Sequence, residues 1–572
     1  MASKSRLLRR TGGAVLALVA TAALAALIPL TQEDFRLSGT QIGDVPVGAL
    51  ETSDNCRACH GDFDPEDEPY STWAGSLMGL AGRDPLFLAQ MTNANQDVAN
   101  VGTFCLRCHV PMSFVTGHAA DASGQTLDDT DRDGVTCHFC HSLVDPVYVP
   151  GQSPPEDEEV LAGLDAVPEH YGNAMFVLDP QGRRRGPYEE TDAPHVTIAS
   201  PFVKSSAMCG TCHDVGNVAT WRRPDGSWRY NAVDQPVADE NLWAQFPLER
   251  TYTEWKLSAF NSPTGVDLQG RFGGENASTV GTCQDCHMPT TTARGCFYGR
   301  VRDDLARHEF AGAAAQSLDL ILAHSPDDPR VDPAQVAAAR ARAVSMLRRT
   351  ATLELAREGA ELVARVVNQT GHKIPTGHIE GRRIWLNVRF FDAAGAMVGE
   401  HGHYDADAAE LDEATTTVYE MRVGLSEDAA AATGLPTGLT GHMALADTIE
   451  KDNRIPPRGF TNAAFEAGGA PAVGATYADG QYWSDVRFQI PAGALRAEVA
   501  LFYQSLPRYY IEELRDGNVT DDWGEILHDL WVETRRGEPI EMAARSLPLA
   551  VTGIFADGFE SGYPTAWSGV SP

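Results

Sequence analysis

Ten of the eleven cysteines occur as Cys-x-x-Cys pairs, and a histidine directly follows each pair. The five copies are Cys56/Cys59/His60, Cys105/Cys108/His109, Cys137/Cys140/His141, Cys209/Cys212/His213 and Cys283/Cys286/His287. Random placement of these residue types predicts about 0.006 copies of this motif, which is the attachment signal for c-type haem. The spacing therefore predicts five covalently bound haem c groups.

The order of residues within each motif explains this chemistry. Two thiols one helical turn apart can bond to the two vinyl groups of one haem, and the next residue can direct its imidazole at the iron. The five motif histidines are therefore predicted proximal ligands, whose surroundings tune each redox potential.

Twelve further histidines can supply the sixth iron ligands. The favoured candidates are His118, His195, His308 and His372. His170 and His378 are weaker alternatives, and His138, inside the third motif, is better explained as exposed or near a propionate. If one haem lacks a sixth ligand, that haem is open to substrate.

Paired cysteines have two other common uses in proteins. Disulfides suit an exported protein, but they do not require an adjacent histidine. Zinc binds both cysteine and histidine, but a zinc site does not need histidine directly after the second cysteine five times. Neither alternative explains the repeated motif, and Cys296 is best explained as a small buried side chain.

The N-terminus has the pattern of an export signal. A basic start with Lys4, Arg6, Arg9 and Arg10 precedes an apolar run over 14–30. We therefore assign 1–33 to a signal peptide or an uncleaved N-terminal anchor, and we expect a periplasmic or extracellular protein. Membrane contact is expected only through this segment.

The rest of the chain divides into regions of different periodicity, which predicts an α+β multidomain protein. All five motifs lie in 34–310, where short, broken patterns predict a mostly helical, loop-rich pentahaem cytochrome c domain with no sheet. Residues 311–350 are rich in Ala, Leu and Arg and predict a helical connector.

From residue 351 the pattern alternates and is rich in β-branched and aromatic residues. It predicts an immunoglobulin-like β-sandwich over 351–548 with long insertions at 405–480. The strand-like stretches include HDLWVET at 528–534. Residues 549–572 are polar and glycine-rich and are expected to form a flexible tail.

A short acidic loop could bind calcium. Asp129, Asp131 and Asp133 precede Gly134 and match the first half of a calcium loop. The twelfth position is Cys140 instead of glutamate, so the loop is not an EF-hand. A Ca²⁺ site and a solvated acidic turn are the two interpretations.

The charge of the chain restricts its partners. With 45 Lys+Arg and 78 Asp+Glu, the 572 residues carry a formal charge of −33. This balance excludes a typical nucleic-acid binder and favours redox partner proteins, basic ones among them. The 43% apolar content is ample for packed cores, and the oligomeric state is not predicted.

Several stretches resemble a known family. GVTCHFCH, SAMCGTCHD and CQDCHMP are similar to the periplasmic multihaem cytochromes c related to the tetrahaem cytochrome and hydroxylamine oxidoreductase of nitrifying bacteria. RTYTEWKLSAF, NQTGHKIPTG and KDNRIPPRGF resemble segments of exported multihaem cytochromes. The resemblance covers most of 50–545 and implies closely stacked haems with two histidine ligands each. It transfers only to the ten motif cysteines and five motif histidines.

The chain also departs from the catalytic relatives. It contains no Cys-x-x-Cys-Lys motif, which the ammonia-forming nitrite reductases use, and five motifs instead of the eight of hydroxylamine oxidoreductases. We therefore expect an electron carrier. The alternative is an oxidoreductase that acts on a small nitrogen or sulfur compound at one open haem, and docking or polymerisation through the β domain is compatible with either.

Overall fold

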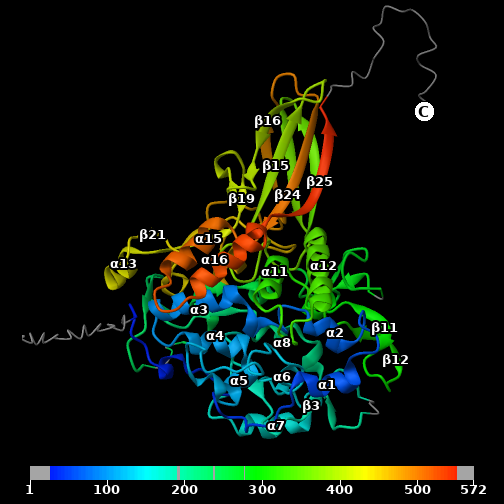
Figure 1. Ribbon diagram of the computed structural model, residues 1–572, viewed down its shortest axis with the longest axis vertical. Helices are drawn as coiled ribbons and strands as arrows, with labels where there is room; N and C mark the ends of the chain where they lie inside the picture. The colour runs from blue at the N-terminus through cyan, green and yellow to red at the C-terminus, as the bar shows by residue number, and fades with distance from the viewer. Residues whose placement is uncertain (1–25, 190–192, 236, 238, 276, 550–572) are drawn as a thin grey trace, which may run out of the picture.

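The computed structural model describes residues 26–189, 193–235, 237, 239–275 and 277–549. The chain forms two tiers (Figure 1). The lower tier contains the five motifs among short helices, and the upper tier contains long strands. Helices α11 (Ala315–His324) and α12 (Pro333–Thr350), within the predicted connector, lie between the tiers.

Short helices carry the motifs in the lower tier, as expected for 34–310. Side-chain oxygens begin three of them: Ser205 caps α8, Thr136 caps α6, and Thr282 forms a capping box with Asp285 in α10. The helices of this tier are α1 (Ser53–His60), α2 (Pro69–Ala74), α3 (Pro85–Asp97), α4 (Gly102–His109), α5 (Pro111–Val115), α6 (Cys137–Cys140), α7 (Pro155–Ala162), α8 (Ser206–Gly210), α9 (Thr251–Lys256) and α10 (Cys283–His287).

The expectation of no sheet in this tier is wrong in detail, because small two-stranded ladders pin the loops between motifs. Five pairs are antiparallel, and β3–β4 is parallel. The strands are β1 (Leu143–Val144), β2 (Val177–Leu178), β3 (Arg184–Gly186), β4 (Thr197–Ala199), β5 (Val215–Asn217), β6 (Thr220–Arg222), β7 (Trp228–Tyr230), β8 (Phe246–Glu249), β9 (Val266–Asp267), β10 (Thr279–Val280), β11 (Thr290–Arg294) and β12 (Val301–Ala306). Strands of two to six residues are too short for hydrophobic alternation to reveal them.

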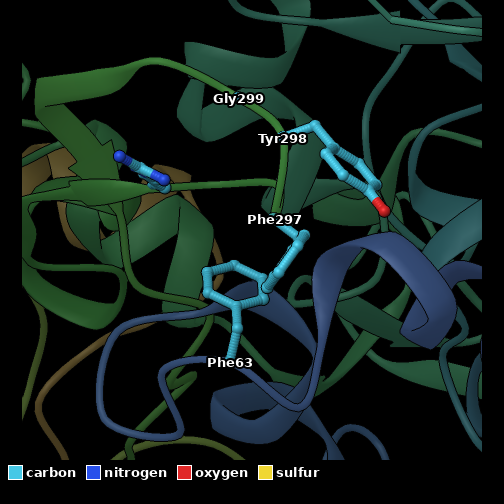
Figure 2. A pocket seen from close by; sticks show the side chains of 5 residues that line it. Phe63, Phe297, Tyr298 and Gly299 are labelled. Atoms are coloured by element: carbon cyan, nitrogen blue, oxygen red, sulfur yellow. The ribbon is translucent and has the colours of Figure 1, made fainter.

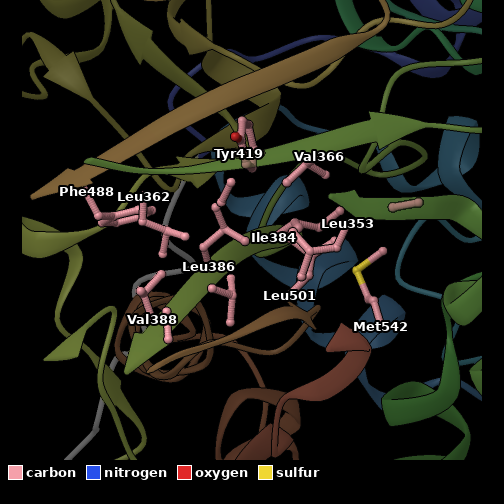
Figure 3. Close-up of a cluster of buried hydrophobic side chains, with 14 of the residues drawn as sticks. Leu353, Leu362, Val366, Ile384, Leu386, Val388, Tyr419, Phe488, Leu501 and Met542 are labelled. Atoms are coloured by element: carbon pink, nitrogen blue, oxygen red, sulfur yellow. The ribbon is translucent and has the colours of Figure 1, made fainter. Parts of the chain in front are cut away.

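The upper tier consists of two facing antiparallel sheets. One has the order β13-β14-β23, and the other has the order β16-β15-β24-β25 with β19 paired to β15. Their inner faces meet in a core that includes Leu353, Leu362, Leu386, Leu501 and Met542 (Figure 3). The strands are β13 (Ala351–Glu358), β14 (Glu361–Asn368), β15 (Arg383–Phe391), β16 (Met397–His401), β19 (Val418–Tyr419), β23 (Trp483–Gln489), β24 (Arg496–Gln504) and β25 (Ile540–Pro548). Its immunoglobulin-like character stays a prediction.

A long excursion separates β16 from β23 and includes the predicted insertion at 405–480. Besides β19, it contains β17 (Tyr404–Asp405), β18 (Glu410–Leu411), β20 (Met421–Leu425), α13 (Glu427–Thr433), β21 (Gly438–Leu439), β22 (Thr448–Asp452) and α14 (Asn462–Ala467). Its segments β20–β22 form a separate three-stranded sheet. Part of this excursion packs against the lower tier, where Leu425 and Leu445 join a core with Ala94 and Val98.

The strand predicted over 528–534 is wrong. Residues 523–533 form helix α16 (Trp523–Glu533), which packs against α15 (Arg508–Gly517) and α3. Leu527, Leu530 and Trp531 are buried at helical spacing. A short apolar run fits both the strand repeat and the helix repeat. Here the segment is helical, and its apolar face packs against α3.

The chain ends lie partly outside the described residues. These include 1–25 of the predicted export segment and 550–572 of the tail. Within the predicted export segment, Ile28 and Leu30 are buried, and Ile28 forms a bridge with Val98. None of the helices in the described part of the chain has the length and apolarity needed to cross a bilayer.

Candidate haem sites

The five motifs present free thiols to a shared interior. All eleven cysteines lie in the described part of the chain, are free, and are intermediate in exposure. Several motif cysteines pack against the largest core of the lower tier, near Leu106 and Phe139. Thiol pairs at the edge of an apolar core fit the attachment of covalent haem.

Three of the motif imidazoles are held in an orientation that suits iron ligation. The Nδ1 atoms of His60, His141 and His287 lie 2.5, 2.7 and 2.7 Å from backbone carbonyl oxygens. An Nδ1–H that donates to a carbonyl fixes the tautomer and leaves Nε2 free to bind a metal. The carbonyls belong to Gly295, Arg185 and Ala311 respectively.

The same three imidazoles each face a second histidine. Ring centroids are 6.4 Å apart for His60–His195, 6.2 Å for His141–His308 and 6.5 Å for His287–His372. Two nitrogens about 2 Å from one metal place their ring centroids roughly 6 Å apart. The spacing of all three pairs therefore fits one iron between two imidazoles.

The facing histidines also have the protonation state of ligands. Burial lowers the pKa of His308 to about 3 and that of His372 to about 4. Their Nδ1 atoms lie 3.1 and 3.0 Å from the carbonyl oxygens of Ala306 and Lys373. Both side chains are therefore neutral near pH 7 with Nε2 available, as metal binding requires.

The fourth predicted distal ligand, His118, is not brought to any motif histidine. Its Nδ1 lies 3.0 Å from Asp131 Oδ1, and its side chain is about half exposed. The ring contacts of the described residues pair neither His109 nor His213 with a second histidine in this way. Instead, the His109 ring stacks on Phe87 at 3.7 Å, and His213 Nδ1 lies 3.3 Å from Glu249 Oε1.

Contacts between cysteines define how the motifs adjoin. The thiols of three pairs are close enough to interact with each other: Cys56 with Cys137, Cys108 with Cys212, and Cys209 with Cys283. The third motif approaches the fourth, because Cys140 interacts electrostatically with both Cys209 and Cys212. The fourth motif therefore adjoins the second, third and fifth, whereas the first adjoins the third.

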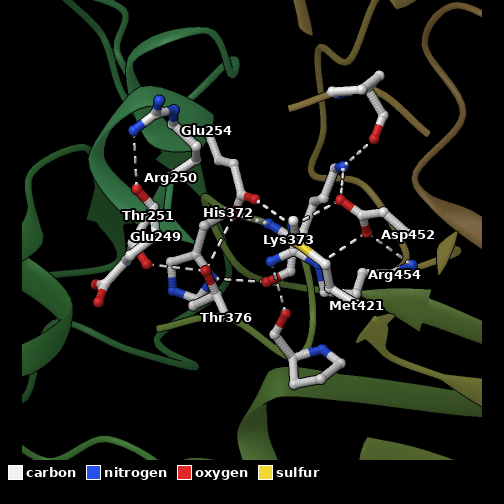
Figure 4. A network of polar contacts seen from close by, with 12 residues as sticks. Glu249, Arg250, Thr251, Glu254, His372, Lys373, Thr376, Met421, Asp452 and Arg454 are labelled. Atoms are coloured by element: carbon white, nitrogen blue, oxygen red, sulfur yellow. Dashed lines mark hydrogen bonds and ion pairs between the residues drawn. The ribbon is translucent and has the colours of Figure 1, made fainter. Parts of the chain in front are cut away.

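His372 comes from the upper tier and is anchored by a buried ion network (Figure 4). Lys373 Nζ lies 2.7 Å from Asp452, and Arg454 bridges Asp452 at 2.8 Å and Glu254 at 3.0 Å. The Lys373 backbone N–H donates to Glu254 Oε2 at 3.0 Å. This network joins α9 of the lower tier to the loop after β14 that carries His372.

The charges of this network come from three stretches that the sequence analysis identified by their resemblance to other cytochromes. RTYTEWKLSAF contributes Glu254, NQTGHKIPTG contributes His372 and Lys373, and KDNRIPPRGF contributes Asp452 and Arg454. The sequence alone did not show that these charges meet. The sequence signal for these three stretches was their resemblance to segments of exported multihaem cytochromes, each with charged residues among apolar, glycine or proline residues.

The same loop carries a second polar cluster toward the second motif. His378 Nε2 lies 3.1 Å from the Tyr510 hydroxyl, and Arg382 donates to the Thr376 carbonyl at 3.2 Å. His378 interacts electrostatically with His109, and burial lowers the pKa of His378 to about 4. The nearby Tyr503 hydroxyl is buried without a well-formed hydrogen bond.

Exposed aromatic side chains adjoin the first motif. The loop between β11 and β12 donates from Phe297 N to the Cys59 carbonyl at 2.8 Å. Phe63, Phe297 and Tyr298 line a shallow pocket there (Figure 2). Phe297 is 52% exposed and Tyr298 is 85% exposed, so this motif lies next to an accessible aromatic surface.

The contacts of the acidic loop at 128–134 do not fit the calcium interpretation. Asp133 pairs with Arg83 and Arg330, and Asp131 accepts hydrogen bonds from Ser113 and the backbone of Asp128. The described residues contain no group of three or more His, Cys, Asp or Glu side chains suited to a metal ion. Arginine guanidiniums occupy the place that the calcium interpretation gave to a cation.

No family model matches the chain, and no curated protein matches it. Among solved structures, it is similar to a penta-heme cytochrome c552 from Thermochromatium tepidum, with a TM-score of 0.47 and 18% sequence identity. That similarity covers 88% of this chain and 99% of the other.

Proposed function

We propose that this protein is an exported pentahaem cytochrome c that transfers electrons, in the periplasm or at the cell surface. The observation that carries the proposal is the set of three histidine pairs, each spaced for one iron, beside three of the five motifs. The ten motif cysteines would hold five haems, whose iron supplies reversible one-electron chemistry. His195, His308 and His372 would be the sixth ligands at three of them.

The adjacency of the motifs supports conduction instead of isolated redox sites. The first motif adjoins the third, the third adjoins the fourth, and the fourth adjoins both the second and the fifth. Five haems held there would therefore form a continuous row that branches at the fourth motif. The first motif ends this row beside Phe297 and Tyr298. We place the exchange of electrons with a redox partner protein at that exposed aromatic surface.

Haem content tests the proposal directly. The protein is produced with haem-maturation machinery, and haem is measured by the pyridine haemochrome method together with intact mass. We expect five covalent haems per chain, and stepwise reduction by dithionite should convert all of them. A chain that folds with fewer than five haems overturns the proposal.

A second candidate function is oxidation or reduction of a small nitrogen or sulfur compound at one open haem. It is favoured by the polar side chains of His378, Arg382 and Tyr510 near the second motif, which could supply charge and protons. Electron paramagnetic resonance with and without nitrite, hydroxylamine or sulfite separates the two functions. A high-spin haem that responds to one of these compounds favours the enzyme, whereas five unresponsive low-spin haems favour the carrier.

A further inference from the structure

The fourth motif differs from the others in the partner of its histidine. His60, His141 and His287 each place Nδ1 against a neutral backbone carbonyl. His109 Nδ1 lies near the Ala81 carbonyl without a well-formed hydrogen bond. His213 alone of the five places Nδ1 against a carboxylate, that of Glu249.

The pairing of two short strands places this carboxylate beside His213. Strand β5 begins two residues after His213 and pairs with β8, and the register places Glu249 opposite Val215. The Glu249 side chain is only 15% exposed. A ladder of two short strands therefore holds a buried carboxylate beside a proximal imidazole.

A carboxylate partner changes the iron that the imidazole would bind. When Nδ1–H donates to an anion, the ring becomes a stronger electron donor at Nε2. A stronger donor stabilises the ferric state over the ferrous state and lowers the reduction potential. A neutral carbonyl increases electron donation from Nε2 less than a carboxylate does. The other proximal histidines would therefore donate less electron density to their irons.

The position of the fourth motif gives this difference a consequence. It adjoins the second, third and fifth motifs, so it is the junction of the row. Electrons that move from the first or third motif to the second or fifth motif must pass through the fourth. A low potential at the junction raises the barrier between the two halves of the row.

We propose that Glu249 is a positioning residue that makes the His213 haem the lowest-potential centre and the controlled junction of the electron path. This inference rests on the proposed function, because it requires haem at the motif. The last haem to be reduced in a titration is then the one bound by His213.

The test compares Glu249→Gln with the wild type by spectroelectrochemical titration and electron paramagnetic resonance. The amide keeps the size of the side chain and removes its charge. In Glu249→Gln, we expect the ferric/ferrous ratio of the last-reduced haem to fall about tenfold at a given potential. This equals a rise of about 59 mV in its one-electron reduction potential. The signal of that one centre should change while the other four stay fixed.

Two further variants make the result decisive. Glu240→Gln removes one charge from a carboxylate that binds Ser38 instead of a histidine, and it should leave all five potentials unchanged. Glu249→Asp keeps the charge and should keep the low potential, which covers the case in which Glu249→Gln fails to fold. Unchanged potentials in Glu249→Gln, or a shift of an early-reduced haem, overturn the inference. Fewer than five haems in the wild type would instead overturn the proposed function.

Discussion

Two kinds of histidine in this protein differ in how far the sequence reveals them. The proximal ligands follow from local spacing, because each one directly follows its cysteine pair. The facing ligands come from distant segments, such as His195 before β4 and His308 after β12. Only folding brings them opposite a motif, so the sequence could propose His308 and His118 alike and could not separate them. In the structure, the His308 ring faces the motif histidine His141, whereas His118 pairs with Asp131.

Replacing His308 tests this geometry at one site. His308→Ala should convert one low-spin haem to high-spin, because the iron at the third motif loses its second imidazole. His308→Met should keep that haem low-spin and raise its potential, because thioether ligation favours the ferrous state. Electron paramagnetic resonance counts the centres, and a potentiometric titration reports the shift.

A matched control is His324→Ala, since His324 packs against Trp523 and faces no motif histidine. It should leave the spin count and the potentials unchanged. If His308→Ala also leaves the spin count unchanged, His308 is not a ligand, and the pairing with His141 is a packing contact only.

The loop after β14 is the element that would make the upper tier part of a haem site. It carries His372, and the next residue, Lys373, is fully buried in the network with Asp452 and Arg454. Burial lowers the pKa of Lys373, but its carboxylate partner keeps it paired. A buried charge that loses its partner is costly, so the network should fix this loop strongly.

Asp452→Asn should therefore lower the free energy of unfolding by about 3–5 kcal/mol, as for other broken buried ion pairs. It should also perturb the haem at the fifth motif, because the loop that positions His372 loses its anchor. Urea unfolding measures the first effect and electron paramagnetic resonance the second. The control Asp485→Asn breaks the half-exposed pair with Arg365 and should cost no more than about 1 kcal/mol. Equal losses in the two variants would contradict the role of the network.

At this scale the sequence predicted strands well where they are long and half-buried. The alternating runs at 383–391 and 496–504 are β15 and β24, each nine residues long. It failed for the two-residue ladders of the lower tier and for α16, whose residues Leu527 and Trp531 fit a helical face as well as a strand. Tertiary packing determines the secondary structure of these segments, and a local sequence pattern does not carry that information.

The net charge of −33 acts on the molecule as a whole. A strongly negative surface attracts cations and repels anions at long range, and salt screens both effects with a Debye length of about 10 Å at 0.1 M. Electron exchange with a basic partner should therefore be fast at low salt. Hexaammineruthenium and ferricyanide are small redox probes of opposite charge that report the same effect.

We expect the rate of oxidation or reduction by hexaammineruthenium to fall as ionic strength rises, and the rate with ferricyanide to rise. Stopped-flow absorbance of the haem bands measures both, and the comparison uses the signs of the two slopes because the driving forces differ. The Glu249→Gln variant is the internal control, since one buried charge should change a potential without changing either slope. Slopes of the same sign would mean that the local surface at the point of electron exchange, where Arg294 lies beside Phe297 and Tyr298, outweighs the charge of the whole molecule.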